Sequence, residues 1–236
     1  HLSQWEKEDK KALKISSLNC RSLKKHHPDM ISDAVLLKSD MICLQEIWLE
    51  SDENIQDLMI PNYDLHLNSN GRGKGVAAYF KKDKFRHQID IKRENMQLSK
   101  YSAGALDIIV LYRSQQGNYE ELIQIIDEIQ TKHKPQLIVG DFNYCFLENS
   151  PNQTRRYLEK QKFVQMISEL THIKGNLLDH AYLRDLKGEL DCTAKLHSKY
   201  YTDHKGLAII IKNKGKYKSK VMQNICSKDG QSHRSK

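Results

Sequence analysis

The chain has 236 residues and a net charge of +8 at pH 7, and 39% of its residues are hydrophobic. This length suits one substantial layered domain. With no internal repeat and no apolar run of ~20 residues, a repeat array and a transmembrane helix are both disfavoured. The basic charge suits a polyanionic partner, most commonly nucleic acid, although solubility alone would also account for it.

The five cysteines are widely spaced and form no C-x-x-C pair. They predict neither a disulfide framework nor a zinc site, and they fit a reducing intracellular compartment. The first dozen residues, with lysines at 7, 10 and 11, lack the pattern of a signal peptide. Asn152-Gln153-Thr154 is a glycosylation sequon, which matters only in a secreted protein.

Apolar periodicity predicts the elements in chain order. The first half predicts a strand over 13–19, a helix that opens at Pro28-Asp29 and carries Ile31, Ala34, Val35 and Lys38, and strands over 41–44, 76–80, 89–91 and 106–112. The second half predicts a helix burying Leu122, Ile125, Ile126 and Ile129, a strand over 137–139, a helix burying Phe163, Met166, Ile167 and Leu170, and strands over 177–178 and 207–211. The early strands lack a helix between each pair, which favours two packed sheets flanked by helices over a βαβ array.

Three further segments carry chemistry-bearing residues outside these elements. Residues 70–75 are glycine-rich but precede a strand, so we interpret them as a hairpin turn in which Arg72 or Lys74 can also contact a phosphate. His26-His27 has no matching ligand pair and is expected at the surface. Lysines alternate with other residues from Lys212 to Lys220, and the apolar signal stops after Ile211, so residues 212–236 predict a solvated tail. This tail is either a linker or an electrostatic attachment to a phosphate backbone.

Polar side chains follow several of the predicted strands. Glu46 comes just after one strand and can bind Mg²⁺ through oxygen, although a solvated loop carboxylate is the simpler reading. Asp141 and Asn143 follow another strand. Asp141 can shuttle a proton or bind metal, and Asn143 can donate to a phosphoryl oxygen, but an Asx turn gives the same pattern.

Asp203-His204 precedes the last predicted strand. A histidine with an unperturbed pKa of ~6.5 is largely neutral at physiological pH and is a plausible general base. An aspartate elsewhere must then orient its ring, and Asp179 is the candidate. Carboxylates that bind a hard cation, placed beside a general base, are suited to hydrolysing a phosphodiester.

Taken in order, these motifs resemble those of the endonuclease/exonuclease/phosphatase superfamily, from about Leu13 to Ile211. The matching segments are Ser17-Leu18-Asn19, Cys43-Leu44-Gln45-Glu46, residues 75–79, residues 109–114, residues 138–143, Leu178-Asp179-His180 and Tyr201-Thr202-Asp203-His204. Residues 171–180 resemble the corresponding stretch in the endonuclease domains of non-LTR retrotransposons.

The resemblance implies an α/β four-layer sandwich, in which two packed, mostly antiparallel β-sheets are flanked by helices. This domain would span 13–211, between an N-terminal extension over 1–12 and the basic tail over 212–236. It also implies a metal-dependent DNA endonuclease that uses Mg²⁺ (or Mn²⁺) to nick DNA, as in retrotransposon target-site cleavage. We expect a monomer that binds DNA and no membrane, belongs to a larger polyprotein with a reverse transcriptase, and acts inside the cell, in the nucleus.

The resemblance also implies roles for individual residues. Glu46 would hold the metal, Asn19 and Asn143 would position the phosphate, and Tyr112 would contact it from the other side. His204 would accept a proton from the attacking water or polarise the phosphoryl group.

The remaining roles concern supporting residues. Asp179 would hold the ring of His204, Asp141 would assist the water or the leaving oxygen, and Asp203 would complete the metal network. Contacts to nucleic acid are expected from Arg72, Lys74 and Arg113. Arg21 departs from the pattern, because some members carry an acidic residue at this place.

Two alternative functions stay open. One is a phosphatase or phosphodiesterase acting on RNA, an inositol phosphate or a lipid, which the basic charge and residues 171–180 disfavour. The other is a catalytically inactive nucleic-acid-binding module, and the complete set of motifs argues against it.

Overall fold

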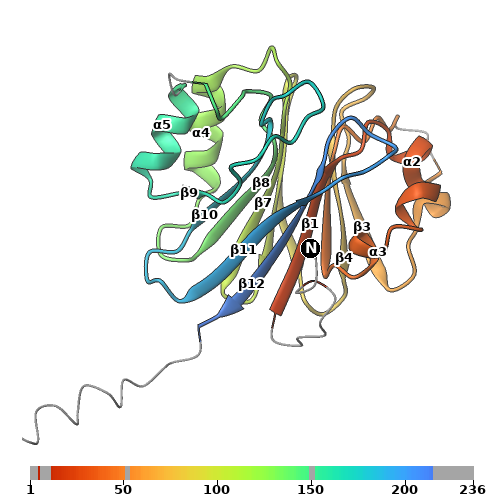
Figure 1. Ribbon diagram of the computed structural model, residues 1–236, viewed down its shortest axis with the longest axis horizontal. Coiled ribbons are helices and arrows are strands. Elements are labelled where there is room, and N and C mark those ends of the chain that lie inside the picture. The colour runs from red at the N-terminus through yellow and green to blue at the C-terminus, as the bar shows by residue number, and fades with distance from the viewer. Residues whose placement is uncertain (1–4, 6–11, 51–53, 149–151, 215–236) are drawn as a thin grey trace, which may run out of the picture.

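The computed structural model of the protein describes residues 5, 12–50, 54–148 and 152–214. Two six-stranded sheets pack face to face, with helices on their outer sides (Figure 1). The predicted four-layer α/β sandwich is therefore confirmed.

The first sheet has the strand order β11-β12-β1-β2-β4-β3. Its strands are β1 (Ala12–Asn19), β2 (Met41–Gln45), β3 (Tyr63–Asn68), β4 (Val76–Lys81), β11 (Leu190–His197) and β12 (Gly206–Asn213). The second sheet has the order β5-β6-β7-β8-β10-β9. Its strands are β5 (Arg86–Arg93), β6 (Met96–Ala103), β7 (Leu106–Arg113), β8 (Gln136–Asp141), β9 (Val164–Gln165) and β10 (Asp179–Arg184).

The helices cover the outer faces of the sheets. Figure 1 shows α2 (Leu23–Met30) and α3 (Ala34–Leu37) beside the first sheet, and α4 (Tyr119–Ile129) and α5 (Gln153–Lys160) beside the second. A short 3-10 helix, η1, spans Ile55–Leu58. No helix in the described part of the chain is long and apolar enough to cross a membrane.

Alternation along the central strands builds the core. On β7, Ile108 and Val110 face the other sheet, while Ile109 and Leu111 face the layer of α4 and α5. Successive side chains of a strand point to opposite faces, so a strand buried on both faces is apolar throughout. This explains why the runs over 108–112 and 137–139 are continuously hydrophobic.

Helix α4 is the predicted helix that buries Leu122, Ile125, Ile126 and Ile129. The Asn118 side chain caps it by accepting from the backbone N–H groups of Glu120 and Glu121, at 2.7 and 3.1 Å. The two acidic residues of its first turn also favour the helix, because they face the positive end of its dipole.

The helix predicted over Phe163–Leu170 is wrong. Phe163 and Ile167 are buried, but residues 164–165 form β9, which pairs with β10, and Leu170 is 41% exposed. The Gln165 side-chain oxygen accepts from the backbone N–H groups of Met166 and Ala181, at 3.1 and 3.0 Å, and so ties the segment to the sheet. The nearby helix is α5, which the polar sequence of residues 153–160 concealed.

Other boundaries also differ from the prediction. Helix α2 begins at Leu23 and includes Pro28, whereas α3 has only four residues. His26 and His27 are buried against the molecule rather than at the surface. The strand predicted over 177–178 begins at Asp179, and β3, β6 and β11 had no apolar run to predict them.

Other expectations concern segments that the structure only partly describes. The first described strand begins at Ala12 and the last ends at Asn213. Most of the predicted N-terminal extension, and the tail from residue 215, lie outside the described residues. The four described cysteines are all free thiols.

Candidate active site

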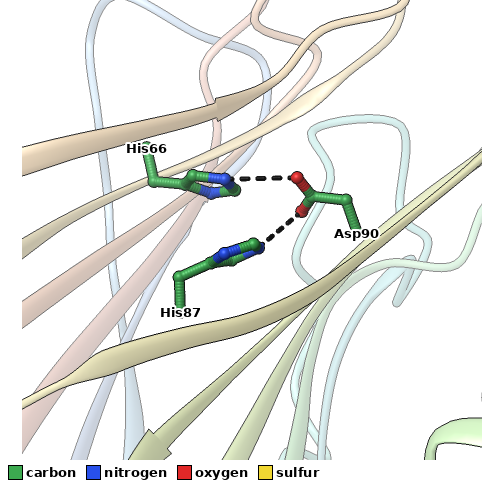
Figure 2. Close-up of side chains that lie close together, drawn as sticks. All are labelled: His66, His87 and Asp90. Atoms are coloured by element: carbon green, nitrogen blue, oxygen red, sulfur yellow. Dashed lines mark hydrogen bonds and ion pairs between the residues drawn. The ribbon is translucent and has the colours of Figure 1, made fainter.

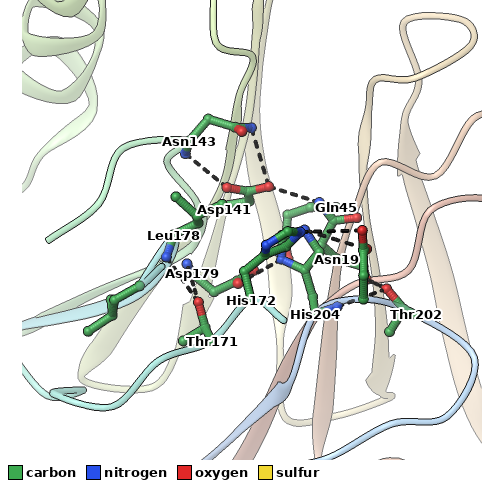
Figure 3. A network of polar contacts seen from close by, with 12 residues as sticks. Asn19, Gln45, Asp141, Asn143, Thr171, His172, Leu178, Asp179, Thr202 and His204 are labelled. Carbon is green, nitrogen blue, oxygen red and sulfur yellow. Dashed lines mark hydrogen bonds and ion pairs between the residues drawn. The ribbon is translucent and has the colours of Figure 1, made fainter. Parts of the chain in front are cut away.

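One end of the sandwich gathers the predicted site residues. In each sheet the central pair of strands is parallel, β1 with β2 and β7 with β8, so the carboxyl ends of these strands meet at the same edge. Asn19 ends β1, Glu46 follows β2, and Asp141 ends β8 opposite both Tyr112 on β7 and Asp179 on β10. Figure 3 shows side chains from both sheets converging there.

The turn that follows β8 depends on Gly140. A Cβ atom at this position would lie 1.8 Å from the Leu111 carbonyl oxygen, and φ is +148°. Only glycine allows β7 and β8 to approach this closely. Asn143 then adopts a positive φ of 48°, and its backbone N–H donates to Asp141 Oδ1 at 2.8 Å. The predicted Asx turn is therefore present beside the candidate catalytic aspartate.

Asn19 joins the two sheets. Its Nδ2 atom donates to Glu46 Oε1 and to Asp141 Oδ2, both at 2.8 Å. Trp48 Nε1 donates to the second Glu46 oxygen at 3.2 Å. Asn143 Nδ2 donates to the Arg113 carbonyl oxygen at 2.8 Å and lies 3.3 Å from Asp141 Oδ2. Both carboxylates are thus held in place by amide and indole donors.

Asp179 holds the ring of His204, as the sequence pattern predicts. His204 Nδ1 lies 2.8 Å from Asp179 Oδ2, and both side chains are buried. Thr171 Oγ1 accepts from the backbone N–H groups of Leu178 and Asp179, both at 3.0 Å (Figure 3). Thr171 therefore fixes the start of β10, which gives residues 171–180 a positioning role.

The charge of His204 differs from the expectation for a neutral base. Burial alone lowers the pKa of His204, but the charge and hydrogen bond of Asp179, together with the charges of Asp141 and Asp203, raise it to about 9. The ring is therefore protonated at neutral pH in the metal-free protein. Its Nε2–H can donate to a phosphoryl oxygen, which favours the polarising role over the general-base role.

The pKa of Asp141 is also raised, which disfavours the charged form of this side chain. Burial, followed by the negative charge of Asp179, raises the pKa of Asp141, and the charge of His204 only partly offsets this. A carboxyl group whose pKa is raised toward neutral pH is suited to accepting and releasing a proton.

Asp203 lies between cations. Arg21 Nη1 donates to Asp203 Oδ2 at 2.5 Å, and His172 Nε2 lies 3.3 Å from the same oxygen. Burial opposes ionisation, but the charges of His204, Arg21 and His172 outweigh it and lower the pKa of Asp203. The arginine that departs from the expected pattern therefore neutralises Asp203, while Asp203 Oδ1 faces His204 Nε2 at 3.9 Å.

A family model described as the Endonuclease/Exonuclease/phosphatase family matches residues 17–204, which include all of these side chains. The chain belongs to the endonuclease/exonuclease/phosphatase family. Members of this family are hydrolytic nucleases and phosphatases. No curated protein sequence matches the chain significantly.

Solved structures of this family share the fold at low sequence identity. The endonuclease domain of TRAS1, a telomere-specific non-LTR retrotransposon, is 14% identical, with a TM-score of 0.67 over 86% of this chain and 99% of that one. An AP endonuclease from Archaeoglobus fulgidus is 17% identical, with a TM-score of 0.63 over 84% and 98%. The human Nocturnin catalytic domain is 14% identical, with a TM-score of 0.62 over 87% and 95%.

The donor set fits the divalent cations that this family generally uses. Asp141, Asp179 and His204 each offer a ligand atom within 4.8 Å of the others, and Glu46 joins this group through Asn19. The buried Oδ1 atoms of Asp179 and Asp203 have no hydrogen-bond partner. Buried carboxylate oxygens need a partner, and hard cations such as Mg²⁺ or Mn²⁺ prefer oxygen ligands.

The residues predicted to contact nucleic acid separate into two groups. Arg113 is only 2% exposed, and its guanidinium donates to the carbonyl oxygens of Gly117 and Phe142 at 3.0 and 2.8 Å. It is a structural cation under the loop that carries Asn143, and the expectation that it contacts nucleic acid does not fit this burial. Arg72, in contrast, is exposed on the hairpin loop between β3 and β4.

Two other predicted site residues, Lys74 and Tyr112, make hydrogen bonds at this hairpin. Lys74 is half-buried, and its Nζ donates to the Glu94 carbonyl oxygen at 2.5 Å. Tyr112, which lies opposite Asp141 on β7, donates from its hydroxyl to the Gly73 carbonyl oxygen at 3.0 Å and so ties the hairpin to the second sheet. The hairpin turn itself is confirmed, since β3 and β4 pair in antiparallel register on either side of it.

Sequence reasoning missed a pocket of about 420 Å³ beside Asp203. It is lined by Arg21, Lys25, His26, Trp48, Ile173, Tyr200, Tyr201, Thr202 and Asp203. Tyr200 is 83% exposed, and the Arg21 guanidinium lies 6.0 Å from the centre of the Trp48 ring. The available signal was the pair of tyrosines directly before the Thr202-Asp203-His204 motif.

Proposed function

We propose that the protein is a metal-dependent phosphodiesterase that nicks DNA. The observation that carries this proposal is the buried Asp179–His204 pair, which shares one site with Asp141 and with the Asn19 amide that joins Asp141 to Glu46. A cationic hydrogen-bond donor, a proton acceptor and a carboxylate for a hard cation together supply what metal-assisted phosphodiester hydrolysis uses.

In the proposed reaction, protonated His204 donates from Nε2 to a non-bridging phosphoryl oxygen, and Asp179 keeps the ring oriented and charged. Asp141 accepts the proton of the attacking water as the new O–P bond forms and the P–O bond to the leaving oxygen breaks, and the leaving oxygen then takes up a proton from solvent. Asn19 and Asn143 hold the Asp141 carboxylate during this step. A divalent cation held by Glu46 would supply positive charge to the phosphate.

The pocket beside the site supports a nucleic-acid substrate. It combines the cations Arg21 and Lys25 with the aromatic rings of Trp48 and Tyr200. Such a pairing binds the backbone through charge and stacks bases on the rings. The net charge of +8 acts in the same direction. A small phosphate ester would use little of this surface.

Target-site nicking, as by a retrotransposon, is the finer part of the proposal. It draws support from the positioning role of Thr171 in the stretch that resembles retrotransposon endonuclease domains. The similar fold of a domain whose name specifies such an element is consistent with it. On this proposal the chain acts on DNA as one part of a polyprotein with a reverse transcriptase.

The test is conversion of supercoiled plasmid to the open circle. We expect nicking with Mg²⁺ or Mn²⁺, none with chelator, and a large loss in Glu46→Gln, whereas His133→Gln, which changes an exposed histidine, should be fully active. Parallel assays with abasic DNA, RNA and an inositol phosphate compare substrates. Preferred hydrolysis of RNA or inositol phosphate, or full activity of Glu46→Gln at low Mg²⁺, would contradict the proposal.

A further inference from the structure

A second cluster of ligand-type side chains lies away from the active site, on the edges of the two sheets. It consists of His66 on β3, which is the edge strand of one sheet, and His87 and Asp90 on β5, which is the edge strand of the other. Figure 2 shows both imidazole rings turned toward the same carboxylate. We call these three residues the edge cluster.

The nitrogens of the edge cluster converge on Asp90. His66 Nε2 lies 3.2 Å from Asp90 Oδ2, and His87 Nε2 lies 3.0 Å from Asp90 Oδ1. The ligand atoms of all three residues lie within 4.8 Å of one another. The four ligands of a tetrahedral Zn²⁺ at ~2.0–2.1 Å are roughly 3.4 Å apart, so these side chains need only small rotations to enclose an ion.

We propose that His66, His87 and Asp90 form a binding site for a first-row divalent cation, with Zn²⁺ as the expected metal. Two imidazole nitrogens and one carboxylate oxygen are ligands that Zn²⁺ accepts readily, whereas Mg²⁺ prefers oxygen alone. Three protein ligands leave a fourth position for water. This proposal does not rest on the nuclease activity.

A hydrogen bond behind the ligands supports the site. His66 Nδ1 lies 2.7 Å from the Tyr101 hydroxyl, so an Nδ1–H that donates to Tyr101 leaves the Nε2 lone pair directed at the ion. Ser99 Oγ donates to Asp90 Oδ1 at 2.6 Å and fixes the carboxylate. Outer hydrogen bonds of this kind hold metal ligands in orientation.

Charge also favours a cation at this place. The His66 and His87 rings stack with centroids 3.8 Å apart, and each presents its Nε2 atom to the negatively charged Asp90 carboxylate. A dication placed between them would meet one carboxylate charge and two imidazole ligands. The exposed fractions of the three side chains are 22%, 32% and 34%, which leaves the ion a path from solvent.

A metal at the edge cluster would link the two sheets. The Asn68 side chain already joins β3 to the second sheet by donating to the carbonyl oxygens of Ile91 and Leu98, at 3.2 and 3.0 Å. Coordination by His66 and His87 would add a second connection along the same edge. The site would therefore stabilise the sandwich, and no catalytic step is assigned to it.

The test is a zinc titration of the chelator-treated full chain, with bound zinc per chain measured after gel filtration. We expect His66→Gln and His87→Gln each to lose one equivalent relative to the wild type, and the exposed control His133→Gln to lose none. Zinc bound at cysteines or at the active site is common to all four proteins and cancels in the comparison.

Two further measurements keep the proposal falsifiable. Tyr101→Phe retains the ring but removes the hydroxyl, and it should weaken zinc binding ~10–100-fold. Zinc at 100 times its Kd should shift the folding equilibrium about 100-fold more in the wild type than in His87→Gln. Equal zinc stoichiometry in the wild type and both histidine variants, with native circular dichroism, would overturn the site.

Discussion

The active site and the edge cluster contain the same residue types but treat charge in opposite ways. In the active site, Asp141 and Asp179 are both buried beside one histidine, so negative charge is crowded and the pKa values of Asp141 and His204 are both raised. In the edge cluster, one half-exposed aspartate faces two histidines and a serine hydroxyl. Burial opposes its ionisation, but these partners lower the pKa of Asp90 to about 2.

This difference separates a site prepared for proton transfer from one prepared for binding. Crowded carboxylates hold protons near neutral pH, where they can be exchanged with a substrate. A carboxylate whose pKa is lowered stays ionised at neutral pH and can coordinate a cation without first losing its own proton. Histidine next to aspartate is therefore not a functional signature by itself, and the number and burial of the carboxylates decide.

The largest expected difference between the clusters is in turnover. His204→Ala removes the protonated donor and should lower kcat by ~10²–10⁴-fold with DNA affinity nearly unchanged. His87→Gln, which removes a histidine that also pairs with aspartate, should leave kcat at the wild-type value. Steady-state nicking rates measure both. A loss of only a few-fold in His204→Ala would make that residue structural.

The second prediction concerns whether Asp179 acts through His204. Asp179→Asn removes the charge that keeps the ring protonated and should lower kcat by a similar order. Residues that act as a unit fail together, so the double variant with His204→Ala should be hardly slower than either single variant. Single-turnover rates for the four proteins of this cycle provide the test, and losses that multiply would separate the two residues.

The third prediction uses the pH dependence of unfolding in the metal-free protein. The folded pKa of His204, about 9, lies above the ordinary ~6.5, so its stabilisation is complete below ~6.5 and is lost as pH rises through about 9. This loss is roughly 3 kcal/mol. Urea titrations between pH ~6.5 and about 9 measure this loss of unfolding free energy, and it should be absent in His204→Gln.

Asp90 provides the matched contrast to His204 in the same titrations. Its folded pKa, about 2, lies below the ordinary ~3.9, so its stabilisation is present above ~3.9 and is lost as pH falls through about 2. Because the side chain is partly exposed, this loss is only about 1 kcal/mol. Asp90→Asn should reduce the loss of unfolding free energy at acid pH and leave the loss at alkaline pH unchanged.

The smallest expected effect concerns the cations around the active-site end. Arg72→Ala should weaken DNA binding and flatten its salt dependence by roughly 0.9 if the exposed guanidinium neutralises one phosphate. Arg113→Lys should instead lower the melting temperature with an unchanged salt slope, because Arg113 bonds backbone carbonyls. Binding isotherms at several salt concentrations distinguish these outcomes.

The sequence predicted the site better than the elements that surround it. Glu46 and Asp141 directly follow short apolar runs, so their positions at strand ends could be inferred, and the order of the motifs supplied their neighbours. β11 escaped prediction because its side chains alternate between exposed and half-buried and form no apolar run. Arg113 was misjudged because no pattern tells that its guanidinium turns inward to backbone carbonyls.

The edge cluster shows why the rest could not be inferred. His66 lies on a strand with few apolar residues, and His87 and Asp90 lie on a strand of the other sheet. Their spacing matches no metal motif, because the ligands meet only through the packing of one sheet on the other. Contacts of this kind depend on tertiary structure and leave no local periodicity to read.

Because the Asn19 amide bonds to both sheets, the alignment of the active site depends on how the two sheets pack against each other. One nitrogen touches Glu46, which follows a strand of the first sheet, and Asp141, which ends a strand of the second. A sliding of the sheets by a fraction of an ångström would strain one of these bonds even with every catalytic side chain unsubstituted. Substitutions deep in the inter-sheet core, such as Val110→Ala, would then reduce turnover without altering the chemistry of the site. Selection for catalysis would in this way also preserve the tight packing of residues that never meet the substrate.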